Sequence, residues 1–206
     1  MIDAHHYSTF LLAALVLAVL PGPGLLYVLA RSLGGGRRDG VHSSFGTLVG
    51  GMVHVFASAV GLSALILASS LAFSVVKYAG AAYLIYLGVR TLLSREQLHL
   101  DVEGVRGQNH AFRQGIVTEL LNPKTALFFL AFIPQFVNPD AGGVFWQFVL
   151  LGTTSVVLNT LADLLVAAFA GPLGARLRLD PRFQRGRKVA SGGAMIALGT
   201  YAAVER

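Results

Sequence analysis

Apolar residues occur along this chain in six long runs, and the short connections between the runs carry most of the charge. At ~1.5 Å per residue, a helix made from the first run exceeds the ~30 Å hydrocarbon core of a bilayer. The pattern therefore predicts a multi-pass membrane protein built from helices. The predicted spans are residues 7–31, 41–67, 71–90, 112–136, 144–170 and 187–204, and the last of these is the shortest.

The first run is interrupted near its middle by Pro21, Gly22, Pro23 and Gly24. In an ordinary helix interior each proline costs ~3 kcal/mol and each glycine ~1 kcal/mol relative to alanine. Five further apolar runs follow, and no Lys or Arg precedes the first run, so we expect a retained span rather than a cleaved signal peptide. We interpret this segment as a transmembrane helix with a functional break.

Internal similarity relates the two halves of the chain. A shift of 102 positions places Pro21 on Pro123, so that a proline interrupts both the first and the fourth span. The matches occur in the same order in two sets of three spans. Further matches pair Leu25 with Leu127, Tyr27 with Phe129, Gly46 and Thr47 with Gly152 and Thr153, and Gly88 with Gly199.

Three is an odd number, so the second set of spans must cross the membrane in the opposite sense to the first. We therefore predict an all-α membrane domain over residues 1–206, made of two inverted three-helix repeats with broken first and fourth helices. The repeats occupy about 7–90 and 112–204, and a cytoplasmic linker of about 91–111 joins them. Secondary transporters frequently have this architecture, and matched broken spans are the best sequence indication of their binding site.

Composition and charge agree with this interpretation. The chain is 54% hydrophobic and 13% charged, against roughly 25% charged in an average soluble domain. Its net charge of +6 does not indicate nucleic-acid binding, because the basic residues lie in loops between spans. By the positive-inside rule both termini lie outside the cytoplasm. The alternate connections carry Arg31, Arg37, Arg38, Arg90, Arg95, Arg106, Arg113, Arg176, Arg178, Arg182, Arg185, Arg187 and Lys188.

The prolines of the two breaks release backbone groups that a polar ligand can use. Proline removes the hydrogen bond to the carbonyl four residues earlier, so Pro21, Pro23 and Pro123 free the carbonyls of Leu17, Val19 and Glu119. Free carbonyls suit an ammonium group, and the N–H groups of the half-helices after the breaks suit a carboxylate. We therefore predict a zwitterionic substrate at Pro21, Gly22, Pro23, Gly24, Asn122, Pro123, Lys124 and Asn159, with Lys124 assisting the anion.

Ionisable residues inside the predicted spans are few, and each costs ~2.5 to 3.5 kcal/mol at the bilayer centre, so each suggests a function. Asp163 lies on a polar stripe with Ser155 and Asn159, spaced every four residues on one helix face. It is our first candidate for proton coupling. His54 and Glu119 are the other candidates. Alternatively, His54 only forms a hydrogen bond within a close contact between helices. We expect Glu119 to lie nearer the cytoplasmic mouth.

Two aromatic clusters are better explained by the bilayer than by a substrate. The cluster at residues 128–132 and the group Phe145, Trp146 and Phe148 are expected to face lipid or the interface. The chain has no cysteine, which excludes thiolate metal sites and cysteine nucleophiles.

On its motifs, the chain resembles the LysE/RhtB family of bacterial amino-acid exporters, also called LysE-type translocators or homoserine/threonine efflux proteins. The resemblance covers about residues 8–204 and rests on PGPGLLYVLARSLGGGRRDG, FGTLVGGMVHV, KYAGAAYLIYLGVR and LLNPKTALFFLAFIPQFV. It implies export of amino acids or related metabolites from the bacterial cytoplasm across the plasma (inner) membrane by proton antiport. It also implies no cofactor or metal, and an oligomer for which a homodimer is one candidate.

Other functions remain open at this point. A passive channel, or efflux of another small solute or cation, would use the same broken spans. A membrane assembly subunit would not need matched breaks. An enzyme is not indicated, because no metalloprotease, serine-hydrolase or nucleotide-binding motif is found.

Overall fold

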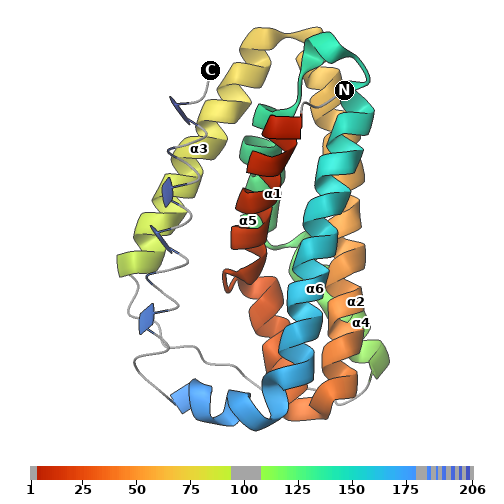
Figure 1. Ribbon diagram of the computed structural model, residues 1–206, viewed down its shortest axis with the longest axis vertical. Helices are drawn as coiled ribbons and strands as arrows, with labels where there is room; N and C mark the ends of the chain where they lie inside the picture. Colours follow the sequence, from red (N-terminus) through yellow and green to blue (C-terminus); the bar gives the residue numbers. More distant parts are fainter. Residues whose placement is uncertain are drawn as a thin grey trace.

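The computed structural model describes residues 4–93 and 108–179, together with ten single positions between 185 and 204. Its helices run roughly parallel to one long axis (Figure 1). In chain order they are α1 (Ala4–Val19), α2 (Pro23–Ala68), α3 (Ser70–Leu93), α4 (Gln108–Leu120), α5 (Pro123–Leu127), the π-helix η1 (Phe128–Phe132), the 3₁₀ turns η2 (Ile133–Phe136) and η3 (Pro139–Ala141), and α6 (Val144–Leu179).

Helix α2 contains two antiparallel legs that meet at Gly36. Its backbone there has φ 80° and ψ 178°, a conformation that glycine adopts readily and other residues avoid. The first leg (residues 23–35) descends in Figure 1, and the second leg (residues 37–68) returns to the upper end. The predicted first span (7–31) thus corresponds to α1 with the first leg, and the predicted second span (41–67) to the second leg. That each of them crosses the membrane stays a prediction.

Two helices of the described ranges are long and apolar enough to cross a membrane, namely α2 over Pro23–Leu65 and α6 over Val144–Ala170. The bent pair Gln108–Leu120 and Pro123–Phe136, whose two parts meet at 43°, is also long and apolar enough for a span if its two parts are taken together. Most of the predicted sixth span (187–204) and of the predicted linker (91–111) lies outside the described residues. The arrangement in two inverted repeats stays a prediction.

The second leg of α2 is the centre of the bundle and packs against both α4 and α6. Small residues allow its close approach to α4: a Cβ atom on Gly115 would lie 2.7 Å from the carbonyl oxygen of Ser43, and one on Gly50 would lie 2.8 Å from that of Ile116. Such contacts are typical of helix pairs in membranes. The close helix contact that the glycines of this span indicate is therefore confirmed.

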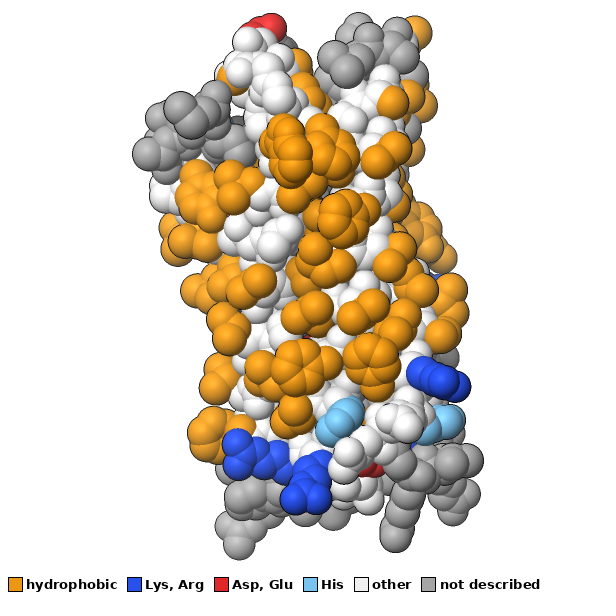
Figure 2. Space-filling model, turned by 90° about the vertical axis from the view of Figure 1, so that its right-hand side faces the viewer, with side chains coloured by type: hydrophobic (Ala, Val, Ile, Leu, Met, Phe, Trp, Pro, Cys, Tyr) orange, Lys and Arg blue, Asp and Glu red, His pale blue; other side chains and the backbone are white. Residues whose placement is uncertain are grey.

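The surface also has the character of a membrane protein. Apolar side chains cover the middle of the face in Figure 2, whereas Lys and Arg gather at its lower end. Exposed apolar residues such as Leu12, Phe56 and Leu165 are 67%, 53% and 60% exposed, which in water would expose a large apolar surface but suits contact with lipid. The chain is therefore an all-α membrane protein, as its sequence predicts.

The aromatic cluster of residues 128–132 corrects one prediction. Phe128, Phe129 and Phe132 are buried in the core rather than facing lipid, and the prediction is wrong likewise for Phe148 of the second aromatic group, which is 0% exposed. Apolar positions of a membrane span look alike in sequence whether they meet lipid or protein, so the pattern alone could not separate them. Trp146 is 70% exposed, as an interfacial anchor requires.

Candidate functional site

The first break separates α1 from α2 near the middle of the long axis (Figure 1). Helix α1 ends at Val19, and Gly22 precedes Pro23, the first residue of α2, without a side-chain cap. Pro21 has no N–H group with which to continue the helix. The carbonyl oxygens of Leu17 and Leu20 consequently become acceptors for a group from elsewhere in the protein.

The second break separates α4 from α5 and has a cap of its own. The Asn122 side chain accepts a hydrogen bond from the Lys124 backbone N–H (3.1 Å), and Pro123 occupies the first helical position. Both are favoured residues for a helix start. The Glu119 carbonyl, which Pro123 was predicted to free, accepts from the Asn122 N–H and from His54 Nε2, both at 3.1 Å.

The two breaks meet through Lys124. Its Nζ donates to the carbonyl oxygens of Leu17 (2.6 Å) and Leu20 (2.8 Å), 107 and 104 residues away in the chain. Gly22 makes room for this side chain, because a Cβ atom there would lie 2.8 Å from Lys124 Cδ. These contacts confirm that the breaks at Pro21–Gly24 and Asn122–Lys124 face each other.

Lys124 nevertheless has a different partner from the one predicted. We expected the Leu17 carbonyl to accept from a substrate ammonium and Lys124 to bind a substrate anion. In the structure the Lys124 ammonium itself donates to the Leu17 carbonyl. An ammonium group within the membrane is costly without acceptors. The carbonyl that Pro21 releases, that of Leu17, and the carbonyl of Leu20 just beyond the end of α1 satisfy this need.

Glu119 lies at the same junction, on the other side of the first break. It is 8% exposed and accepts hydrogen bonds from Thr125 Oγ1 (2.5 Å) and Asn122 Nδ2 (3.0 Å). A Cβ atom on Gly24 would collide with Glu119 Oε2. Its carboxylate therefore lies beside the first turn of α2, and the expectation that Glu119 lies nearer the cytoplasmic mouth stays a prediction.

Helix α6 supplies the opposite wall with its polar stripe. Asp163 is 5% exposed and accepts a hydrogen bond from Thr47 Oγ1 (2.8 Å) of the second leg of α2. Asn159 Nδ2 donates to the Ser155 carbonyl at 2.9 Å. Ser155 Oγ is buried and has no hydrogen-bond partner among the described residues. The stripe thus faces the bundle interior, as predicted.

These groups enclose a cavity of about 40 Å³. That volume holds about three water molecules at ~10–15 Å³ each. Asp163, Glu119 and Lys124 all contribute to its wall, whereas His54 donates to a backbone carbonyl and stacks on Phe129 with ring centroids 5.8 Å apart. The lining residues are Ala14, Leu17, Gly22, Gly24, Leu25, Thr47, Gly51, Glu119, Asn122, Lys124, Thr125, Phe128, Phe129, Ser155, Val156, Asn159, Thr160 and Asp163.

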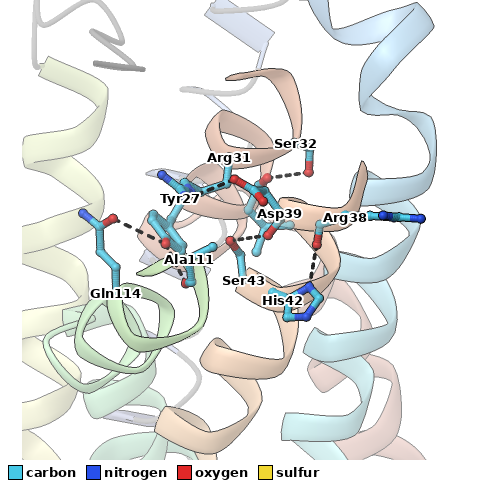
Figure 3. Close-up of polar contacts among 10 residues, drawn as sticks. Tyr27, Arg31, Ser32, Arg38, Asp39, His42, Ser43, Ala111 and Gln114 are labelled. Atoms are coloured by element: carbon cyan, nitrogen blue, oxygen red, sulfur yellow. Dashed lines mark hydrogen bonds and ion pairs between the residues drawn. The ribbon is translucent and has the colours of Figure 1, made fainter. Parts of the chain in front are cut away.

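A second polar cluster lies between the cavity and the Gly36 turn (Figure 3). Tyr27, one helical turn after Gly24, donates its hydroxyl to the Ala111 carbonyl of α4 at 2.7 Å. Arg31 and Asp39 form an ion pair of 3.1 Å between the two legs of α2. The cluster ties the first leg of α2 to its neighbours on this side of the cavity.

Several polar residues of these sites were not predicted as functional, among them Asp39 of the second polar cluster. Thr47 attracted notice only as a repeat match, and Tyr27 likewise. Thr125 follows directly on the second break, and only this position in the sequence could have indicated that it belongs to the site. Metal binding has no support in the described part of the chain, where no group of three His, Asp or Glu side chains is placed to hold an ion.

Comparison with known proteins gives a family and several relatives. The sequence profile of the LysE type translocator family matches residues 15–206. A leucine efflux protein of Salmonella choleraesuis is 31% identical over 156 residues, which are 75% of this chain and 74% of the relative.

Two further relatives have comparable similarity. A homoserine/homoserine lactone efflux protein of Salmonella typhimurium is 32% identical over 175 residues, or 81% of this chain and 84% of its own length. An uncharacterized membrane protein of Vibrio cholerae is 32% identical over 178 residues, or 85% and 86%. No solved structure matches the chain significantly.

Proposed function

This chain belongs to the LysE type translocator family, and from that premise we propose that it exports amino acids from the bacterial cytoplasm across the inner membrane. The observation that carries the proposal is the meeting of the two helix breaks at one buried cavity, where Lys124 reaches Leu17 and Leu20. Two relatives of similar length are named as efflux proteins, one for leucine and one for homoserine and homoserine lactone. All three molecules carry a primary ammonium, and leucine and homoserine also carry a carboxylate.

The substrate would bind where the released backbone groups converge. Its ammonium would meet the carbonyls before Pro21, and its carboxylate would meet Lys124 and the first N–H groups of α5 after Pro123. Gly22 and Gly24 leave the backbone open on this side. Asn122 positions the start of α5, and Asn159 lines the facing wall on α6.

Export against a gradient requires an energy source, and we assign proton coupling to Asp163. Its carboxylate is buried, lines the cavity and accepts from the neutral Thr47 hydroxyl. A carboxyl group in this position can bind a proton from one side and release it to the other while the substrate occupies the same cavity. Glu119 and His54 are the alternatives, but both already hold the second break together.

Orientation follows from charge. Arg31 and Asp39 pair beside the Gly36 turn. That turn of α2 lies at the lower end of the molecule in Figure 1, and Lys and Arg gather at the lower end in Figure 2. By the positive-inside rule this end faces the cytoplasm, and α1 begins at the opposite, external end. The second polar cluster would then lie on the cytoplasmic side of the cavity, on the path that a substrate takes to enter.

Proteoliposomes that contain the purified protein test the proposal. With leucine or homoserine inside and an imposed proton gradient, we expect concentrative transport that a protonophore abolishes; transport that only equilibrates the two sides would indicate a channel. Asp163→Asn should remove the concentrative component, whereas Asp140→Asn, at the exposed turn η3, should not. Concentrative, protonophore-sensitive transport by Asp163→Asn would assign the proton to another residue.

A further inference from the structure

The two charged side chains of the second break lie on either side of the first break. The Lys124 ammonium is bound by the carbonyls of Leu17 and Leu20, which precede the break. The Glu119 carboxylate lies against Gly24, in the first turn of the helix that follows it. The protein thus places a positive and a negative group of its own where the ends of a broken helix attract them.

These positions coincide with those that the charges of a zwitterionic substrate would take. The Leu17 carbonyl, which Pro21 releases, and the Leu20 carbonyl at the end of α1 are suited to a primary ammonium, and Lys124 Nζ is a primary ammonium. Its stem passes Gly22 so closely that a Cβ atom there would lie 2.8 Å from Lys124 Cδ. A second ammonium at the same two oxygens would be repelled by the like charge of Lys124 a few ångströms away.

The remaining space leads to the same conclusion. The cavity holds about 40 Å³, whereas pockets for small organic ligands measure roughly 300 Å³ or more. Because Lys124 lines this space and is held at the Leu17 carbonyl, withdrawal of its side chain would enlarge the cavity at the place where a substrate ammonium would bind.

An unpartnered hydroxyl independently indicates that the cavity is built for a ligand. Ser43, Ser44 and Thr160 each donate to the carbonyl four residues earlier, which is the usual solution for a hydroxyl in a membrane helix. Ser155 Oγ does not, although it is 1% exposed and lines the cavity. A buried hydroxyl without a partner is costly, and a bound molecule would supply that partner.

We propose that Lys124 is a tethered occupant of the substrate's ammonium site, which the incoming ammonium displaces from the Leu17 and Leu20 carbonyls. The displaced Lys124 then pairs with the substrate carboxylate. This inference rests on the proposed function and adds a selection rule to it. A transported molecule needs a primary ammonium to displace Lys124, and a carboxylate on that molecule stabilises Lys124 after displacement.

The rule is testable with leucinamide, which has the ammonium of leucine but no carboxylate. In the wild-type protein leucinamide must compete with Lys124 for the two carbonyls, and it has no carboxylate with which the displaced Lys124 could pair. Lys124→Met keeps an unbranched side chain but removes the competing ammonium. We expect purified Lys124→Met in detergent to bind leucinamide at least tenfold more tightly than the wild type does, by equilibrium binding with radiolabelled ligand.

Two comparisons make this result specific. Ethylammonium chloride should displace leucinamide from Lys124→Met, whereas tetramethylammonium chloride, which has no N–H group, should not. Arg113→Met, which removes an exposed charge from the same crossing, should bind leucinamide as the wild type does. Equal or weaker binding of leucinamide by Lys124→Met would overturn the proposal.

Folding of the variant is the remaining control. If Lys124→Met does not give folded protein, Lys124→Gln decides by the same measurement, since its neutral amide is a weaker competitor: tighter leucinamide binding supports the proposal, and equal or weaker binding overturns it. These experiments measure ammonium binding and not transport. A wild-type protein that transports no amino acid would therefore refute the proposed function, and the leucinamide comparison would remain a separate result.

Discussion

The two helix breaks use different chemistry although they occupy corresponding positions in the chain. The first, at Pro21–Gly24, has no polar side chain and offers only backbone groups. The second has polar side chains on both sides of Pro123: Glu119, Asn122, Lys124 and Thr125. The first break supplies carbonyl oxygens that accept hydrogen bonds, and the second break supplies the side chain that donates to them.

The difference also shows in how each break is stabilised. Asn122 caps the second break from within its own segment, whereas Gly22 at the first break contributes no side-chain cap. The released carbonyls of the first break are satisfied by Lys124 from the second. A protein with two equivalent breaks would not need them to meet, but here the first depends on the second. The glycines are what allow the contact.

The largest effect should come from filling the space between the breaks. Gly22 has φ −111° and ψ −179°, extended backbone that any residue adopts, so Gly22→Leu acts only through its collision with Lys124. Overpacking of this kind costs ~1–3 kcal/mol, and we expect export of radiolabelled amino acid from cells to fall by roughly tenfold or more. Immunoblots of the membrane fraction must show normal protein levels.

Gly61→Leu is the matched control for that substitution. Gly61 lies on the same helix, α2, and a Cβ atom there would meet nothing within 4 Å. Export should stay near the wild-type rate. If Gly22→Leu exported as well as Gly61→Leu, the close contact of the two breaks would not matter for transport.

A smaller effect should follow from changing the acceptor at the second break. One carboxylate oxygen of Glu119 accepts a hydrogen bond from Thr125 Oγ1, and the other accepts one from Asn122 Nδ2. Glu119→Gln replaces one acceptor by a donor, leaving a buried donor unpaired at a cost of ~1–3 kcal/mol. We expect a lower thermal unfolding midpoint in detergent, and no such change for Asp140→Asn. A midpoint equal to that of the wild type would show that this network contributes nothing to stability.

The smallest effect should come from His54. Its Nε2 donates to the Glu119 carbonyl, which also accepts from the Asn122 N–H, so loss of one donor leaves that carbonyl paired. Export by His54→Gln should stay within about twofold of the wild type, because an amide can donate in its place and one neutral hydrogen bond contributes only ~0.5–1.5 kcal/mol. Loss of proton-coupled transport in this variant would move the coupling role from Asp163 to His54.

Much of the fold could be predicted because the apolar runs and the prolines act locally. Pro21 and Pro123 identify the two breaks and the carbonyls of Leu17 and Glu119 that they release, since the geometry of one helix decides this. Asp163 was selected from its spacing with Ser155 for the same reason.

The partners of these groups could not be predicted, because they depend on how distant segments pack. Thr47 meets Asp163 across 116 residues, and Lys124 meets Leu17 across 107. No periodicity within one helix contains that information. Lys124 was assigned to the substrate anion because the sequence cannot show that a four-carbon side chain already reaches the released carbonyls.

The most direct test of the central claim, that amino acids bind where the two breaks meet, uses the absence of native cysteine. Ser155→Cys places one thiol on the cavity wall, and its rate of modification by 2-aminoethyl methanethiosulfonate can be measured with and without an amino acid that the wild type exports. We expect the amino acid to slow modification severalfold at this position and not at Asp140→Cys on the exposed turn η3. An unchanged rate at Ser155→Cys, in a variant that still transports, would contradict the claim.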